Sequence, residues 1–216
     1  MDLNFERTFQ RKDEIRQSKK IFIFCEGAKT EPAYFKYFQE MDSRLDIQIF
    51  GSMDGEDNTP AGLLTKAESK INELKESNDI EGSDEIWIVF DTEKPENDAQ
   101  RGNQITTLKC GCNSYGWGAA ESNPSFEICL YYHFHESKPM RDDVQLFTSF
   151  KEFVNAKIPG GFDPRKDPKK INLAIVNSKA NYNTQSERLM STNVFLLAES
   201  IMVILSEKYH GLFTSS

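Results

Sequence analysis

The chain has 216 residues, of which 38% are hydrophobic and 28% charged, with a formal net charge of -8 and a pI of about 5.0. These values are typical of a soluble globular chain, and the length allows one α/β domain with a full core. An acidic chain is not a general binder of polyanions. Contact with nucleic acid would therefore require a local basic patch, a metal site or a basic partner.

The N-terminal segment and the cysteines predict a cytoplasmic protein. The residues up to Ser18 are charged and lack the apolar stretch of a signal peptide. No apolar run approaches the roughly 20 residues that a membrane span needs, so we expect no membrane association. Four cysteines in a chain of this size indicate a reducing compartment: Cys25, Cys110, Cys112 and Cys129.

Apolar runs and helix-start signals alternate along most of the chain. Ile21–Cys25 and Ile86–Phe90 are continuously apolar, as strands buried on both faces of a parallel sheet are. Thr30 can cap a helix, with Pro32 in its first turn. In chain order we predict a strand at 21–25, a helix from Thr30, a strand at 47–49, a helix from Thr59, a strand at 86–90, a helix over 95–112, a strand at 114–120, and helices beginning near Asn123, Leu146, Asp167 and Thr192.

This order of elements predicts an α/β fold, a parallel-sheet core flanked by helices with a helical C-terminal extension. We expect an N-terminal arm at 1–18, a core at 19–136 and the helical extension at 137–216, together forming one compact unit.

Three carboxylates follow the two apolar strands. Glu26 comes directly after the first strand, and Asp91 and Glu93 come directly after the third, two residues apart on an extended segment. Ends of parallel strands meet at one edge of a sheet, where ligands bind in open α/β folds. Carboxylate oxygens suit Mg²⁺, which can polarise a phosphodiester and activate water. The alternative is that these acids only cap helices or face solvent.

Two motifs resemble those of the RloB-like proteins. One is EGxxTExxYF after an apolar strand, here Glu26–Phe35, and the other is SNPxFE, here Ser122–Glu127, followed by the pair His133-Phe134. That family is assigned to the Toprim superfamily, with the OLD-type nucleases, topoisomerases and bacterial primases. The resemblance implies a Toprim-like core.

The resemblance also implies roles for the three carboxylates. Glu26 would be a general acid or base and a metal-associated group, and Asp91 and Glu93 would be ligands of Mg²⁺ (or Mn²⁺). Glu93 departs from the common D-x-D pattern, because its side chain is longer by about a methylene.

Further residues are candidates for contacts with a nucleic-acid substrate. Lys29 lies beside Glu26, Asn123 and Glu127 belong to the second motif, and basic residues precede a later helix. For each of them, capping, packing or simple solvation is the competing interpretation. The full set of predicted substrate contacts is Lys29, Asn123, Glu127, His133, Lys169 and Lys170.

Together these features predict a Mg²⁺-dependent nuclease that cleaves DNA or RNA phosphodiesters. The resemblance implies a role in phage defence near restriction genes, with an ATPase partner; the oligomeric state stays open. One alternative is a non-catalytic module that binds nucleic acid or a partner protein on the same scaffold. Another is a phosphoryl-transfer enzyme acting on a nucleotide, although the chain lacks the GxxxxGK[ST] phosphate loop.

Overall fold

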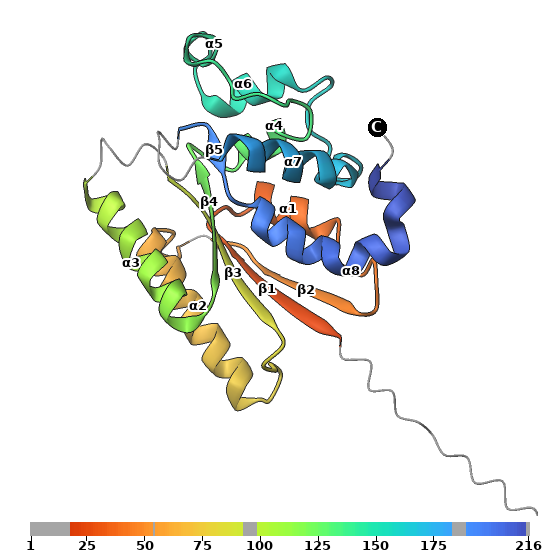
Figure 1. Cartoon of the computed structure of the whole chain (residues 1–216). Coiled ribbons are helices and arrows are strands. Elements are labelled where there is room, and N and C mark those ends of the chain that lie inside the picture. Colours follow the sequence, from red (N-terminus) through yellow and green to blue (C-terminus); the bar gives the residue numbers. More distant parts are fainter. Residues whose placement is uncertain (1–17, 54, 93–98, 183–188, 215–216) are drawn as a thin grey trace, which may run out of the picture.

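A computed structural model describes residues 18–53, 55–92, 99–182 and 189–214 (Figure 1). Its centre is a five-stranded sheet with strand order β2-β1-β3-β4-β5. The first four strands pair in parallel, and β5 is antiparallel to β4. The strands are β1 (Lys19–Cys25), β2 (Leu45–Phe50), β3 (Glu85–Asp91), β4 (Gly118–Asn123) and β5 (Ser191–Thr192). The predicted α/β fold with a parallel-sheet core is thus confirmed.

Helices cover both faces of the sheet (Figure 1). On one side lie α2 (Pro60–Glu76) and α3 (Ala99–Tyr115), and on the other lie α1 (Thr30–Lys36) and α8 (Phe195–Thr214). The helices between β4 and α8 are α4 (Glu127–Tyr131), α5 (Arg141–Gln145), α6 (Phe150–Lys157), the 3₁₀ helix η2 (Asp167–Lys170) and α7 (Ile171–Asn181).

The alternation of side chains along β1 divides the interior into two cores. Phe22 and Phe24 pack with residues of α2 and α3, whereas Ile21, Ile23 and Cys25 pack with the helices of the opposite face. All five side chains are completely buried. Successive side chains of a strand point to opposite faces, so a strand covered on both sides is apolar at every position.

The predicted helix starts at Thr30 and Thr59 are confirmed, but Thr30 does not cap its helix, because the N-cap residue of α1 is Lys29 and no side chain caps it. Thr59 caps α2, and its side-chain oxygen accepts a hydrogen bond from the Gly62 N–H at 3.2 Å, with Pro60 as the first helical residue. The two apolar runs form β1 and β3, and the short alternating segment lies within β2.

Other boundaries were predicted wrongly. The strand expected at 114–120 begins only at Gly118, because α3 continues through Tyr115. The helix expected near Asn123 is the five-residue α4, since Asn123 itself is the last residue of β4. Thr192 belongs to β5 and does not start the last helix, which begins at Phe195.

Candidate functional site

The ends of three neighbouring strands form the candidate site, which we call the carboxyl edge and define by Glu26, Asp91 and Asn123. Glu26 follows β1, and Asp91 and Asn123 are the last residues of β3 and β4. Cys25 pairs with Val89 and Asp91 with Ser122, so the parallel register brings the three strand ends to one level. The sheet thus unites residues far apart in sequence, as the pattern of strands predicted.

The Glu26 side chain is held by contacts at both carboxylate oxygens. Oε2 accepts a hydrogen bond from the Asp91 N–H at 2.9 Å, and Oε1 pairs with Nη2 of Arg101 at 2.7 Å. The same Nη2 donates to the Asp91 carbonyl oxygen at 2.8 Å. The side chains of Glu26 and Arg101 are only 14% and 13% exposed. The ends of β1 and β3 are therefore joined through the Glu26 carboxylate and the Arg101 guanidinium.

The turn after Glu26 is packed against a second buried carboxyl group. Glu31 in α1 accepts a hydrogen bond from the Gly27 N–H at 3.2 Å. A Cβ atom at Gly27 would lie 2.1 Å from Oε2 of Glu31, which is far inside van der Waals contact. Glycine at this position thus lets the Glu31 carboxyl group lie against the backbone beside Glu26.

The environment of Glu31 disfavours its negative charge. Burial raises the pKa of the Glu31 carboxyl group, and the charges of Glu127 and Glu26 raise it further, while hydrogen bonds from backbone N–H groups partly offset these effects. Glu26 is instead paired with the guanidinium of Arg101, at 2.7 Å. The two neighbouring carboxyl groups are therefore in different electrostatic environments.

The second motif contributes Asn123 and Glu127. The Asn123–Pro124 peptide bond is cis, and α4 begins three residues after Pro124 with Glu127. Glu127 accepts a hydrogen bond from Oγ of Ser125 at 2.6 Å and lies 3.8 Å from Nζ of Lys151. The negative charge of Glu127 also contributes to the raised pKa of the buried Glu31 carboxyl group.

The donor atoms at the carboxyl edge suit a hard cation. Besides the carboxylates of Glu26 and Asp91, the edge contains Oδ1 of Asn123 and Oγ1 of Thr92, two buried oxygens that form no hydrogen bond within the described residues. Thr92 as a whole is 6% exposed. Such oxygens are the ligands that Mg²⁺ prefers, so the residues present fit the ion.

A complete set of metal ligands is not assembled by the described part of the chain. Within it, no group of three or more His, Cys, Asp or Glu side chains is arranged to hold a metal ion. The predicted ligand Glu93 lies outside the described residues. The predicted metal site thus remains a prediction that rests on Glu26 and Asp91.

The other predicted substrate contacts lie in different environments. Lys29 is exposed in the turn before α1 and is accessible to a ligand. Lys169 is exposed on η2, and Nζ of Lys170 lies 3.8 Å from the centre of the Phe134 ring. The contact of Lys170 with Phe134 thus engages this lysine in packing within the helical C-terminal part of the chain.

The position of His133 argues against a contact with substrate. Its side chain is completely buried, Nε2 lies 3.2 Å from the Tyr34 hydroxyl, and Nδ1 lies 2.9 Å from the Cys129 carbonyl oxygen. Burial lowers the pKa of His133 to about 4. His133 is therefore a neutral core residue, with both ring nitrogens engaged by the protein.

Sequence reasoning missed Arg101 and Glu31. A basic residue in the first turn of a helix faces the positive end of the helix dipole, and this unfavourable position could have marked Arg101 as a paired residue. Glu31 is part of the first motif, but nothing in the sequence indicates that its side chain is 4% exposed.

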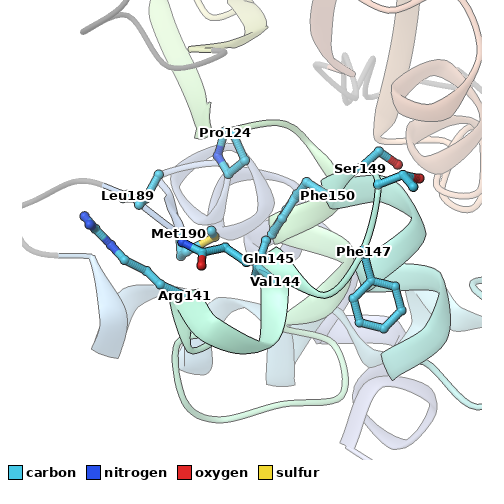
Figure 2. Close-up of a pocket in the computed structure, with 10 residues that line it drawn as sticks. Pro124, Arg141, Val144, Gln145, Phe147, Ser149, Phe150, Leu189 and Met190 are labelled. Atoms are coloured by element: carbon cyan, nitrogen blue, oxygen red, sulfur yellow. The ribbon is translucent and has the colours of Figure 1, made fainter.

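A separate pocket of about 340 Å³ lies beside the second motif (Figure 2). Its walls come from α5, the start of α6 and the residues before β5, and it reaches Pro124, the neighbour of Asn123. Figure 2 shows the side chains of Gln145 and Phe150 among those that line it. The residues that line it are Pro124, Arg141, Val144, Gln145, Phe147, Thr148, Ser149, Phe150, Leu189 and Met190. None of the carboxylates that follow β1 and β3 is among them.

In the described residues, no helix has both the length and the apolar character that crossing a membrane requires.

Comparison with known proteins gives a family but no characterised relative. No curated protein and no solved structure matches the chain. A family model described as RloB-like protein matches residues 21–201. This range includes both motifs, most of β1 and all of the other four strands. The chain therefore belongs to the RloB-like family.

Proposed function

We propose that this protein is a Mg²⁺-dependent nuclease whose site is the carboxyl edge. The observation that supports the proposal most strongly is the convergence of Glu26 and Asp91. Glu26 follows β1 and Asp91 ends β3, two neighbouring parallel strands, and the Asp91 N–H donates a hydrogen bond to the Glu26 carboxylate. Buried oxygens of Thr92 and Asn123 at the same edge add further donors for a hard cation.

In this proposal different residues of the chain bind the metal ion, transfer a proton and contact the phosphate. Asp91 and Glu26 hold the ion, with Glu93 as the third predicted ligand. A bound Mg²⁺ would supply Lewis acidity toward a phosphodiester and lower the pKa of water. Glu26, which is paired with Arg101, would take part in proton transfer, and the exposed Lys29 can contact a phosphate next to the site.

The nuclease proposal is tested by Asp91→Asn. This variant keeps the size of the side chain but removes its charge, so cleavage of DNA and RNA substrates in Mg²⁺ should fall at least about 100-fold, given that outer-shell contacts alone are worth about 10–100-fold. The control is Asp46→Asn on β2, whose side chain accepts from Gln48 away from the site. Retained cleavage by a folded Asp91→Asn protein would rule out the assignment.

One observation favours the alternative of a non-catalytic binding module. The pairing of Glu26 with Arg101 gives this carboxylate a structural use that needs no metal. A module of that kind would bind nucleic acid or protein without measurable affinity for divalent ions. Titration of the wild-type protein with Mn²⁺, a spectroscopic substitute for Mg²⁺, separates the two functions.

We also propose a cellular setting, on the family resemblance alone. The protein would act in the cytoplasm in defence against phage or other foreign nucleic acid, together with an ATPase partner. The net charge of -8 supports dependence on a partner or on metal, because an acidic chain is repelled by a phosphate backbone.

A further inference from the structure

Arg101 occupies a position that a basic residue normally avoids. It is the third residue of α3, where the N-terminal end of the helix dipole disfavours positive charge. Its side chain is nevertheless only 13% exposed. A buried charge is costly unless it is paired and hydrogen-bonded, so the partners of the guanidinium indicate the role of Arg101.

Two partners of the guanidinium belong to the carboxyl edge. Nη2 lies 2.7 Å from Oε1 of Glu26 and 2.8 Å from the carbonyl oxygen of Asp91. One nitrogen thus bridges the residue that follows β1 and the residue that ends β3. The other oxygen of the carboxylate, Oε2, accepts a hydrogen bond from the Asp91 N–H at 2.9 Å.

We infer that Arg101 is a positioning residue that holds the Glu26 carboxylate against the end of β3, in the orientation that serves metal binding. This inference rests on the proposed function. A carboxylate oxygen has two lone pairs, so Oε1 can accept from Arg101 and still coordinate an ion. Outer-shell groups that orient a ligand in this way typically contribute about 10–100-fold to metal affinity or activity.

The experiment measures Mn²⁺ binding, which needs no substrate and no partner protein. For Arg101→Gln we expect Mn²⁺ affinity to fall about 10–100-fold, with circular dichroism and the unfolding transition showing a folded protein. Arg101→Lys keeps the positive charge and one donor nitrogen, and it should recover part of the loss.

Lys109→Gln is the matched control. Lys109 lies on the same helix and forms an ion pair with Glu121, a residue of β4 that is 4% exposed. The substitution therefore removes a comparable partly buried pair between α3 and the sheet, but away from Glu26. Its Mn²⁺ affinity should match that of the wild-type protein.

The outcomes separate this inference from the proposed function. If the wild-type protein binds Mn²⁺ and Arg101→Gln binds within about twofold of it or more tightly, the inference is overturned. If the wild-type protein binds no Mn²⁺, the proposed function fails. A double-mutant cycle of Arg101→Gln and Glu26→Gln, measured by unfolding without metal, then tests whether Arg101 holds Glu26 in place. Additive losses of unfolding free energy would show that it does not.

Discussion

Glu26 illustrates how much of a site can be predicted one residue at a time. Its position after a buried strand follows from the apolar run before it, because a charged side chain cannot continue a strand covered on both faces. Its pairing with Arg101 could not be predicted from local sequence in this way. Arg101 lies 75 positions further along the chain, and only the packing of α3 on the sheet brings it to Glu26. The role predicted for Glu26 itself remains a proposal.

His133 shows that the type of a residue is not enough to predict a contact with substrate. A histidine beside a family motif suggested a substrate contact, yet the ring is enclosed by Tyr34, Phe162 and the carbonyl oxygen of Cys129. His133 lies two residues after α4, in which Ile128, Cys129, Leu130 and Tyr131 are all buried. Which polar residue is buried depends on the partners that the fold supplies.

The buried His133 predicts a specific dependence of stability on pH. Its pKa is about 4 in the folded protein and near 6.5 when unfolded, so between these values the unfolded state binds more protons. The free energy of unfolding should therefore fall as the pH drops from 6.5 to 4, by up to about 3 kcal/mol from this group. Urea unfolding at several pH values measures it.

His133→Gln supplies the comparison for that experiment, since glutamine cannot gain a proton in this range. The difference in unfolding free energy between the two proteins should shrink toward pH 4 and stay constant above pH 6.5. A difference that does not change with pH would show that His133 is not titrated by unfolding.

At the scale of elements, long apolar strands and capped helices were predicted and short elements were not. β1, β3 and α2 carry several residues of unambiguous pattern. β5 has only two residues, and no periodicity can be read from two. Its existence depends on β4, whose edge it covers as an antiparallel strand.

Asn193, directly after β5, forms two side-chain hydrogen bonds with the backbone of β4, and its substitution tests their contribution to stability. Its Oδ1 accepts from the Glu121 N–H at 2.6 Å, and its Nδ2 donates to the Ala119 carbonyl oxygen at 3.1 Å. Asn193→Ala leaves both backbone groups of β4 without this partner and should lower the free energy of unfolding by about 2–3 kcal/mol. Chemical denaturation measures the change.

Asn172→Ala is a suitable control, because Nδ2 of Asn172 donates a single hydrogen bond to the Phe213 carbonyl oxygen in a part-buried position. We expect a loss of about 1 kcal/mol there. Equal losses in the two variants would contradict the special role of Asn193 at the sheet edge.

For the whole molecule, the order of elements predicted the fold class, while the assembly of the site came from tertiary packing. Strand order places β1 between β2 and β3, so Glu26 lies beside Asp91 and not at an outer strand. The contact of α3 with the carboxyl edge adds Arg101. The pattern predicted that Glu26 and Asp91 would reach the same edge, but neither the strand order nor the contact with Arg101 could be deduced from the sequence, because several strand orders satisfy the same alternation of strands and helices.

The central claim is that the carboxyl edge binds a divalent ion for cleavage of nucleic acid. Anomalous diffraction from a crystal soaked in Mn²⁺ tests it most directly, since it locates the ion without substrate or partner. We expect an anomalous peak between the carboxylates of Glu26 and Asp91. A crystal saturated with Mn²⁺ that shows no peak there, with Glu26 still paired with Arg101 and the Asp91 N–H, would contradict the account.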